Sequence, residues 1–90
     1  MITIRLFAGL RDIVGKKDVQ VEKSDIALGE LLDEFAKQEG DKVKEYLFDD
    51  EGKVLRSVML LINNEPPKNA LDTTVNSGQI VSVLLPTAGG

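Results

Sequence analysis

The C-terminal segment LLPTAGG, residues 84–90, has the clearest potential for chemistry in this chain. Gly89 and Gly90 have no side chains to bury, and glycine loses more backbone entropy on ordering than any other residue. We therefore expect a mobile tail whose use lies outside the fold. Glycine also adopts backbone angles closed to other residues, so the terminal carbonyl could enter a narrow site in a partner. Fully extended, residues 86–90 would reach roughly 17 Å, at about 3.3–3.6 Å per residue.

The rest of the chain offers few side chains for catalysis. It contains no cysteine and no histidine, which removes thiolate nucleophiles, the usual general base and the commonest metal ligands. Asp49, Asp50 and Glu51 are adjacent acids before Gly52, without the alternating spacing of a calcium loop, so they predict a solvated turn. We expect no catalytic side chains, no bound metal and no bound cofactor.

Length and charge narrow the class of protein. A chain of 90 residues has room for one domain, and 42% hydrophobic with 29% charged residues is typical of a soluble globular protein. The net charge of −4 disfavours nucleic acid and anionic membranes and favours partners with basic grooves. No apolar run approaches the ~20 residues of a membrane span, and the N-terminus MITIRLFAGLRD does not resemble a signal peptide. We expect a cytoplasmic protein without nucleic-acid or membrane partners.

Period-two alternation predicts the strands. Apolar and polar residues alternate over 2–7 and again over 16–23, which predicts two antiparallel strands, and the stretch 9–15 between them fits a loop or a single helical turn. An apolar strand follows at 57–64 and ends at the turn NEPP, because proline has no N–H to donate to a ladder. An Asn-Ser-Gly turn at 76–78 leads into a final strand at 80–85.

The apolar spacing changes after Ala27, where residues fall at i, i+3, i+4, i+7 and i+8 and predict one amphipathic helix. Ser24 and Asp25 are the expected caps, and Gly40 is the expected stop. Gly29 inside this helix costs up to about 1 kcal/mol relative to alanine and could permit close packing on the sheet. Residues 41–56 combine a possible short helix with an Asp-Asp-Glu-Gly turn that could close a small hairpin.

This order of elements predicts an α+β fold of the β-grasp (ubiquitin-like) type. A mixed sheet of four to five strands, covered on one face by one main helix, buries both apolar surfaces at once. We expect residues 1–85 to form the domain and residues 86–90 to form a projecting tail. If the first and last strands lie side by side at the centre of the sheet, the tail leaves the sheet directly.

Four stretches carry a family resemblance over nearly the whole chain: MITIRLFAGLRDIVG, ALGELLDEFA, MLLINNEPP and SGQIVSVLLPTAGG. Together they resemble the small, sulfur-carrying subunit of molybdopterin synthase. The relatives of that subunit include the thiamine-pathway sulfur carrier and the small archaeal modifier proteins, which are ubiquitin-like and end in Gly-Gly. Leu84 stands where the molybdopterin-type subunits often have an aromatic residue, and Leu85-Pro86 stands where they often have two prolines.

The resemblance implies a chemistry for the C-terminus. In these families an adenylating enzyme of the ubiquitin-activating type uses ATP to adenylate the terminal carboxylate, which is then converted to a thiocarboxylate or transferred to a lysine amine. Gly90, preceded by Gly89, would be the reacting residue. Because the adenylate supplies the leaving group, a chain without histidine or cysteine can take part. The implied partners are that enzyme and the large subunit of molybdopterin synthase or, for a modifier, lysines of target proteins.

Recognition by these partners requires a surface on the folded body. Phe7, Met59 and Leu84 are candidates for an exposed apolar patch on the sheet face opposite the helix, although core positions are an equal alternative. Three tail residues before the glycines would extend this contact: Pro86, Thr87 and Ala88.

Three hypotheses for function remain. The first is a sulfur carrier of the molybdopterin-synthase type, whose Gly90 thiocarboxylate donates sulfur to a pterin precursor in molybdenum cofactor biosynthesis. The second is a ubiquitin-like modifier joined through Gly90 to lysines, and the third is an interaction domain with an inert tail. If the protein forms chains, any exposed lysine is a possible acceptor: Lys16, Lys17, Lys23, Lys37, Lys42, Lys44, Lys53 and Lys68.

Overall fold

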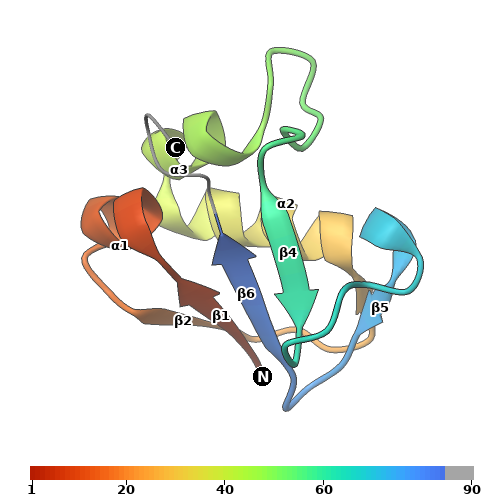
Figure 1. Cartoon of the computed structure of the whole chain (residues 1–90). Helices are drawn as coiled ribbons and strands as arrows, with labels where there is room; N and C mark the ends of the chain where they lie inside the picture. Colours follow the sequence, from red (N-terminus) through yellow and green to blue (C-terminus); the bar gives the residue numbers. More distant parts are fainter. Residues whose placement is uncertain (85–90) are drawn as a thin grey trace.

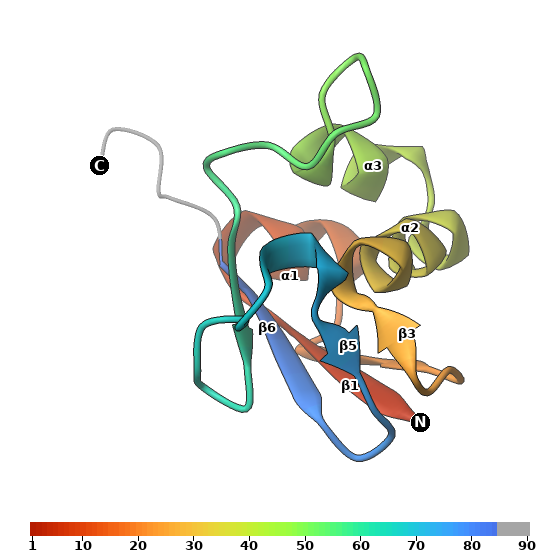
Figure 2. The ribbon, with the colours of Figure 1, turned by 90° about the vertical axis from the view of Figure 1, so that its right-hand side faces the viewer.

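The computed structural model describes residues 1–84, which form a sheet with helices over one of its faces (Figures 1 and 2). The sheet has the strand order β2-β1-β6-β4, with bounds β1 (Ile2–Leu6), β2 (Asp18–Val21), β4 (Met59–Ile62) and β6 (Ile80–Leu84). β1 is parallel to β6 and antiparallel to β2, and β4 is antiparallel to β6. The predicted mixed sheet is confirmed, and the first and last strands are neighbours at its centre.

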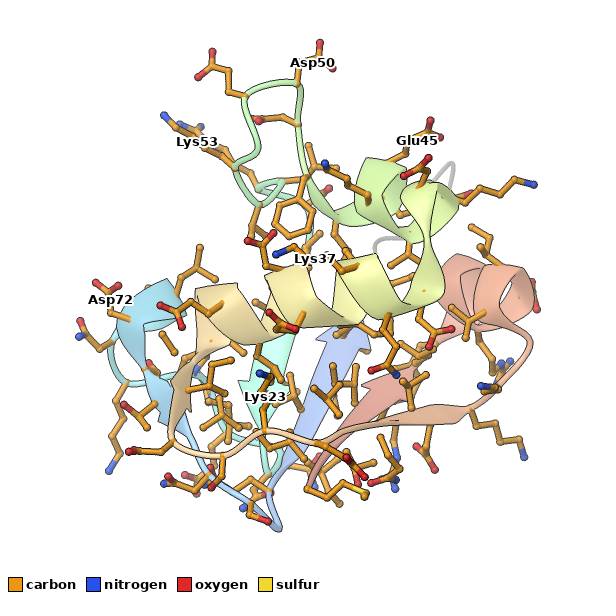
Figure 3. All side chains as sticks on the ribbon, turned by 180° about the vertical axis from the view of Figure 1, so that it is seen from behind. Lys23, Lys37, Glu45, Asp50, Lys53 and Asp72 are labelled. Atoms are coloured by element: carbon orange, nitrogen blue, oxygen red, sulfur yellow. The ribbon has the colours of Figure 1, made fainter. Side chains whose placement is uncertain are left out.

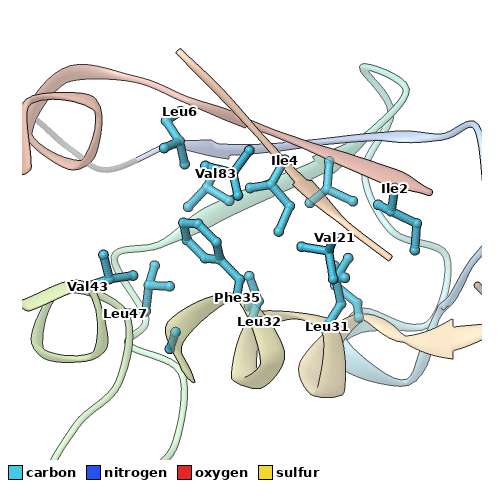
Figure 4. Close-up of a cluster of buried hydrophobic side chains, with 14 of the residues drawn as sticks. Ile2, Ile4, Leu6, Val21, Leu31, Leu32, Phe35, Val43, Leu47 and Val83 are labelled. Atoms are coloured by element: carbon cyan, nitrogen blue, oxygen red, sulfur yellow. The ribbon is translucent and has the colours of Figure 1, made fainter. Parts of the chain in front are cut away.

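The core lies between the sheet and the main helix, α2 (Leu28–Glu39) (Figure 4). Alternate residues of β1 are buried because successive side chains of a strand point to opposite faces. The predicted apolar stripe of α2 is buried against them, with Phe35 fully enclosed. The buried residues that these two elements contribute are Ile2, Ile4, Leu6, Leu28, Leu31, Leu32, Phe35 and Ala36.

Two short helices accompany α2. The stretch predicted as a loop or a single turn is a seven-residue helix, α1 (Ala8–Val14), whose end is marked by Gly15 at φ +79°. Leu10 of α1 is fully buried, so packing against the core stabilises a helix too short to persist by itself. The possible short helix in 41–56 is α3 (Asp41–Leu47), which buries Val43 and Leu47.

The hairpin predicted after α3 is also present. Phe48 pairs with Val54 across it, and the Asp49 carboxylate accepts hydrogen bonds from the backbone N–H groups of Glu51 and Lys53, at 2.9 and 3.0 Å. The Asp49 side chain therefore stabilises the predicted solvated turn. Within residues 1–84 no cluster of three carboxylates is placed to hold a metal ion.

The predicted cap of α2 was wrong. The helix begins after Ala27 without a side-chain cap, and the Leu28 N–H donates to the Thr73 carbonyl at 2.9 Å. Ser24 instead accepts a hydrogen bond from the Ser77 N–H at 3.1 Å, and Asp25 has φ +54°. A tertiary backbone contact thus replaces the local side-chain bond that the sequence suggests. The predicted stop at Gly40 is confirmed.

A second, two-stranded sheet was not predicted. It pairs β3 (Ile26–Ala27) with β5 (Thr74–Val75), which follows a short 3₁₀ helix, η1 (Ala70–Asp72). Strands of two residues are too short to show alternation. Gly29 packs against η1 and not on the sheet, because a Cβ at this position would lie 3.4 Å from the Leu71 Cβ.

No helix in the part of the chain that the structure describes is long and apolar enough to cross a membrane.

Candidate functional site

The candidate site is the root of the C-terminal segment and the surface around it. Leu84 is the last residue that the structure describes, so the predicted tail residues Pro86, Thr87, Ala88, Gly89 and Gly90 lie outside the described residues, as does the end of the predicted strand at residue 85. The predicted surface residues Phe7, Met59 and Leu84 lie inside them. The geometry below therefore concerns the position from which residues 85–90 continue.

The root is held at the centre of the sheet. β6 pairs with β1 on one side and with β4 on the other, so its backbone is hydrogen-bonded to two strands. Val81 and Val83 are fully buried against the helices. This position of β6 follows from its sequence, because an almost uninterrupted apolar strand suits the centre of a sheet rather than an edge. The position of Leu84 is therefore fixed by strand pairing on both sides of β6.

The strand register gathers the three predicted surface residues into one row. Met59 lies directly opposite Leu84, and Phe7 follows Leu6, whose partner on β6 is Val83. Phe7 has extended backbone angles, so it continues the line of β1 beside Leu84. Since Leu6 and Val83 face the core, their successors Phe7 and Leu84 face the opposite side of the sheet.

This opposite side, over which no helix of residues 1–84 lies, is called here the open face of the sheet. Met59 is 59% exposed on it, while Phe7 and Leu84 are half-buried. Large apolar side chains that gather on an exposed face are typical of a protein-protein interface. The geometry places the root of the tail at the edge of such a surface.

Two further apolar residues of the open face were missed by sequence reasoning. Leu61 lies beside Ser82, and Ile80 lies beside Thr3, so both share a face with Met59 and Leu84. Both are half-buried. The run MLLI gives no alternation from which an outward-facing residue can be told, and only the register with β6 separates its two faces. The apolar half of the open face consists of Met59, Leu61, Ile80 and Leu84.

The other half of the open face is polar and internally paired. Arg5 on β1 donates from Nε to Asp18 on β2 at 3.1 Å, and the Thr3 hydroxyl donates to the Gln20 amide oxygen at 3.1 Å. The only carboxylate that the described strands place on this face is thus neutralised by an arginine. A partner can cover the apolar half without removing water from an unpaired acid.

Tyr46 is a third residue that the sequence did not indicate as part of the site. It is 43% exposed, and its ring lies beside Gly9, at 3.6 Å from the position that a Cβ of Gly9 would occupy. Gly9 is only two residues after Phe7, so α3 brings an exposed aromatic ring toward the same end of the molecule as the root. The sequence did not reveal this residue as part of the site, because the bounds and packing of α3 were not predicted.

The comparisons with known proteins agree with this geometry. The model of the ThiS family matches residues 4–90. The chain belongs to the ThiS family. No curated protein sequence matches it significantly.

Solved structures share the fold of this ThiS-family chain. The crystal structure of SAMP1 from Haloferax volcanii superposes with a TM-score of 0.87 at 25% identity, covering 99% of this chain and 98% of that one. CysO in the BexX/CysO complex of Amycolatopsis orientalis gives 0.79 at 23%, with 100% of both chains covered. A putative molybdopterin converting factor, subunit 1, from Pyrococcus furiosus gives 0.73 at 22%, covering 96% of this chain and 97% of that one. The ubiquitin-like β-grasp fold is confirmed over the described residues.

Proposed function

We propose that this ThiS-family protein is a sulfur carrier of the molybdopterin-synthase small-subunit type. Its Gly90 carboxylate is adenylated, converted to a thiocarboxylate, and used to donate sulfur to a pterin precursor in molybdenum cofactor biosynthesis. The observation that carries the proposal is the family match, which extends through residue 90, together with the position of Leu84 beside an exposed apolar surface. The chain contributes the reacting carboxylate and the docking surface.

The chemistry needs no catalytic side chain from this protein. A carboxylate oxygen attacks the α-phosphorus of ATP in the activating enzyme, and pyrophosphate leaves. The resulting acyl-adenylate is attacked at its carbonyl carbon by a sulfide-equivalent nucleophile, and AMP departs with the bonding electron pair. This leaves a thiocarboxylate on Gly90. The absence of histidine and cysteine from the sequence agrees with a division of labour in which partners hold all catalytic groups.

The folded body supplies recognition in this proposal. The apolar half of the open face would be covered by the adenylating enzyme and later by the large subunit of the synthase. A surface of this kind stabilises a complex through burial of apolar area, at about 1.5–3 kcal/mol for each large apolar side chain that becomes fully buried. Because β6 links this surface directly to residue 85, a docked body places the following residues at a defined starting point.

The test is a reconstituted conversion. The protein is mixed with an adenylating enzyme from the same organism, ATP and sulfide, and its intact mass is measured. We expect replacement of one oxygen by sulfur, localised to Gly90 by fragmentation. Deletion of Gly90, or addition of one alanine after it, should abolish the conversion while leaving the circular dichroism spectrum unchanged.

A matched control carries a substitution away from the tail and the open face. Lys23→Arg, at an exposed residue after β2, keeps the chain length and the terminal glycines, and it should be converted at the wild-type rate. A protein without Gly90 that is converted as fast as the full chain would refute the proposal. It would favour the reading in which the tail is inert and partners contact only the sheet.

A second candidate function is supported by the structural likeness to SAMP1, a small archaeal modifier protein. In this alternative the adenylated Gly90 is transferred to lysine amines of other proteins. Mass spectrometry of digested protein from the native cells distinguishes the two functions. Gly-Gly remnants on lysines would show a modifier, whereas a thiocarboxylate without remnants would show a sulfur carrier.

A further inference from the structure

Methionine is the only residue type in this chain whose side chain a peroxide oxidises readily. The chain contains two methionines and no cysteine, no tryptophan and no histidine. The side of the molecule that carries the helices, called here the helix side, has lysines and carboxylates at its surface, including Lys37, Glu45 and Asp72 (Figure 3). These groups do not react with peroxide. Oxidation of side chains is therefore restricted to Met1 and Met59.

Both methionines are accessible to a small oxidant, but they lie at opposite ends of the central strands. Met59 is 59% exposed and lies directly opposite Leu84 at the root of the tail. Met1 is 51% exposed, and its carbonyl accepts a hydrogen bond from the Gly78 N–H at 2.9 Å, at the turn before β6. The five residues of β6 span roughly 16 Å between these two ends, at about 3.3 Å per residue. The chain thus contains an internal control for the effect of oxidation.

Met59 is the residue of the apolar half of the open face that a partner can cover most. The other members, Leu61, Ile80 and Leu84, are already half-buried by their neighbours. Oxidation converts the apolar thioether of methionine into a polar sulfoxide. A sulfoxide oxygen that loses its water in an interface without gaining a hydrogen bond opposes binding. The chemical state of this one sulfur therefore sets how well the open face can be covered.

We propose that Met59 is a site of reversible oxidation by peroxides and that its sulfoxide weakens docking of the adenylating enzyme on the open face. This inference rests on the proposed function, because it concerns the regulation of the same surface. In the reaction the thioether sulfur donates a lone pair to one peroxide oxygen, and a sulfur–oxygen bond forms as the oxygen–oxygen bond breaks. Sulfur is oxidised and the peroxide is reduced. The departing hydroxide takes the proton of the transferred hydroxyl group and leaves as water.

This modification would link the charging of Gly90 to redox conditions. Sulfide and thiocarboxylates are themselves oxidised by peroxide, so a carrier charged while peroxide persists would lose its sulfur after ATP had been consumed. Weaker docking of the oxidised protein prevents that loss. Methionine sulfoxide reductases, one for each epimer, return the side chain to the thioether and restore docking.

The test measures adenylation without sulfide, which would react with the oxidant. The protein is treated with hydrogen peroxide, the peroxide is removed with catalase, and an untreated adenylating enzyme from the same organism is then added. Exchange of labelled pyrophosphate into ATP gives the kinetics, and peptide mass mapping gives the sulfoxide content of each methionine. We expect KM for the protein to rise about tenfold with little change in kcat, because the lost contact is equal in the ground and transition states. Reduction by the two sulfoxide reductases should restore the original KM.

Two variants separate the two methionines. Met59→Leu keeps Met1, so peroxide should still add one oxygen to it, yet KM before and after treatment should agree within twofold. Met59→Gln places a permanent polar group of similar length on the open face. Its KM should exceed that of the untreated protein about tenfold and should not respond to the reductases. Position 59 is exposed, so both variants should fold, which circular dichroism checks.

Failure of this inference is distinguishable from failure of the proposed function. The absence of pyrophosphate exchange with the untreated protein would refute the proposed function and this inference with it. Normal exchange whose KM is unchanged by the Met59 sulfoxide would overturn this inference alone. An equal rise of KM in oxidised Met59→Leu would also overturn it, because the effect would then belong to Met1.

Discussion

The two sides of this molecule differ in charge and in exposed apolar area. The open face joins paired polar residues on β1 and β2 to an apolar half on β6 and β4, and it carries no unpaired acid among the described strands. The helix side carries nine carboxylates over residues 28–53, and most of the large apolar residues of this segment are buried in the core. The net charge of −4 is thus not a property of the whole surface.

This difference refines the expectation drawn from charge alone. A negative chain favours basic partners, but the surface at the root of the tail is locally neutral and apolar. Burial of area therefore governs docking there, and charge governs contact with the helix side. Of the four predictions below, the second separates these two effects, and the other three test the structure of the two sides.

The largest expected effect is on stability, from a substitution in the core between α2 and the sheet. Phe35 of α2 is fully buried between the helix and the sheet, and its truncation in Phe35→Ala leaves a cavity that both layers line. We expect the free energy of unfolding to fall by about 3–5 kcal/mol in a urea titration. A loss below about 1 kcal/mol would show that the two layers do not share one core.

A charge on the open face should damage docking and spare the fold. Met59→Asp places a carboxylate where Met59 is 59% exposed, so we expect little change in the unfolding midpoint. The adenylation of Gly90 should lose about tenfold or more in kcat/KM, since burying one large apolar side chain is worth about 1.5–3 kcal/mol. Lys53→Asp on the helix side is the control, and it should change this rate less than twofold. Equal losses in the two variants would show that the comparison of the two sides is wrong.

Two glycines of the helix side should respond in opposite directions to alanine. Gly40 has φ +111°, which alanine adopts only with strain, so Gly40→Ala should lower the free energy of unfolding by about 1 kcal/mol or more. Gly29 lies inside α2, and the added Cβ would meet Leu71 at 3.4 Å, the near limit of ordinary contact. Gly29→Ala should therefore raise stability by up to about 1 kcal/mol through helix propensity. Thermal unfolding of both variants tests this, and a loss at Gly29 would mean that η1 cannot shift outward.

The smallest effect concerns the polar half of the open face. Arg5 and Asp18 are both partly exposed, and exposed ion pairs contribute about 0.2–1 kcal/mol. Arg5→Gln should lower stability by no more than this, and the difference should shrink when the salt concentration is raised. A larger, salt-independent loss would show that the Arg5 side chain stabilises the sheet by packing and not by charge.

Several elements were predictable because their signal is local. Alternation in β1 and the i, i+3, i+4 stripe of α2 each record which side of one element is buried. Gly40 and the Asn-Ser-Gly turn mark chain reversals through the backbone freedom of glycine. These patterns are sufficient to indicate a β-grasp order of elements.

Other elements were not predicted, because contacts between distant segments stabilise them. The start of α2 is satisfied by the Thr73 carbonyl from a distant segment, so a search for a local cap at Ser24 or Asp25 fails. α1 persists because Leu10 reaches the core, and β3 and β5 exist only as partners of each other.

The candidate site likewise combines features that the sequence predicts with features that depend on tertiary contacts. By itself the sequence determined the Gly-Gly end, the lack of histidine and cysteine, and the family resemblance, since residue identity alone carries these properties. Only the tertiary structure decided that Phe7, Leu84 and Met59 form one row, that Leu61 and Ile80 extend it, and that Tyr46 lies toward the same end. The physical reason is that the register between strands distant in sequence sets which side chains share a face. That register is fixed by the packing of the whole core and not by any single segment.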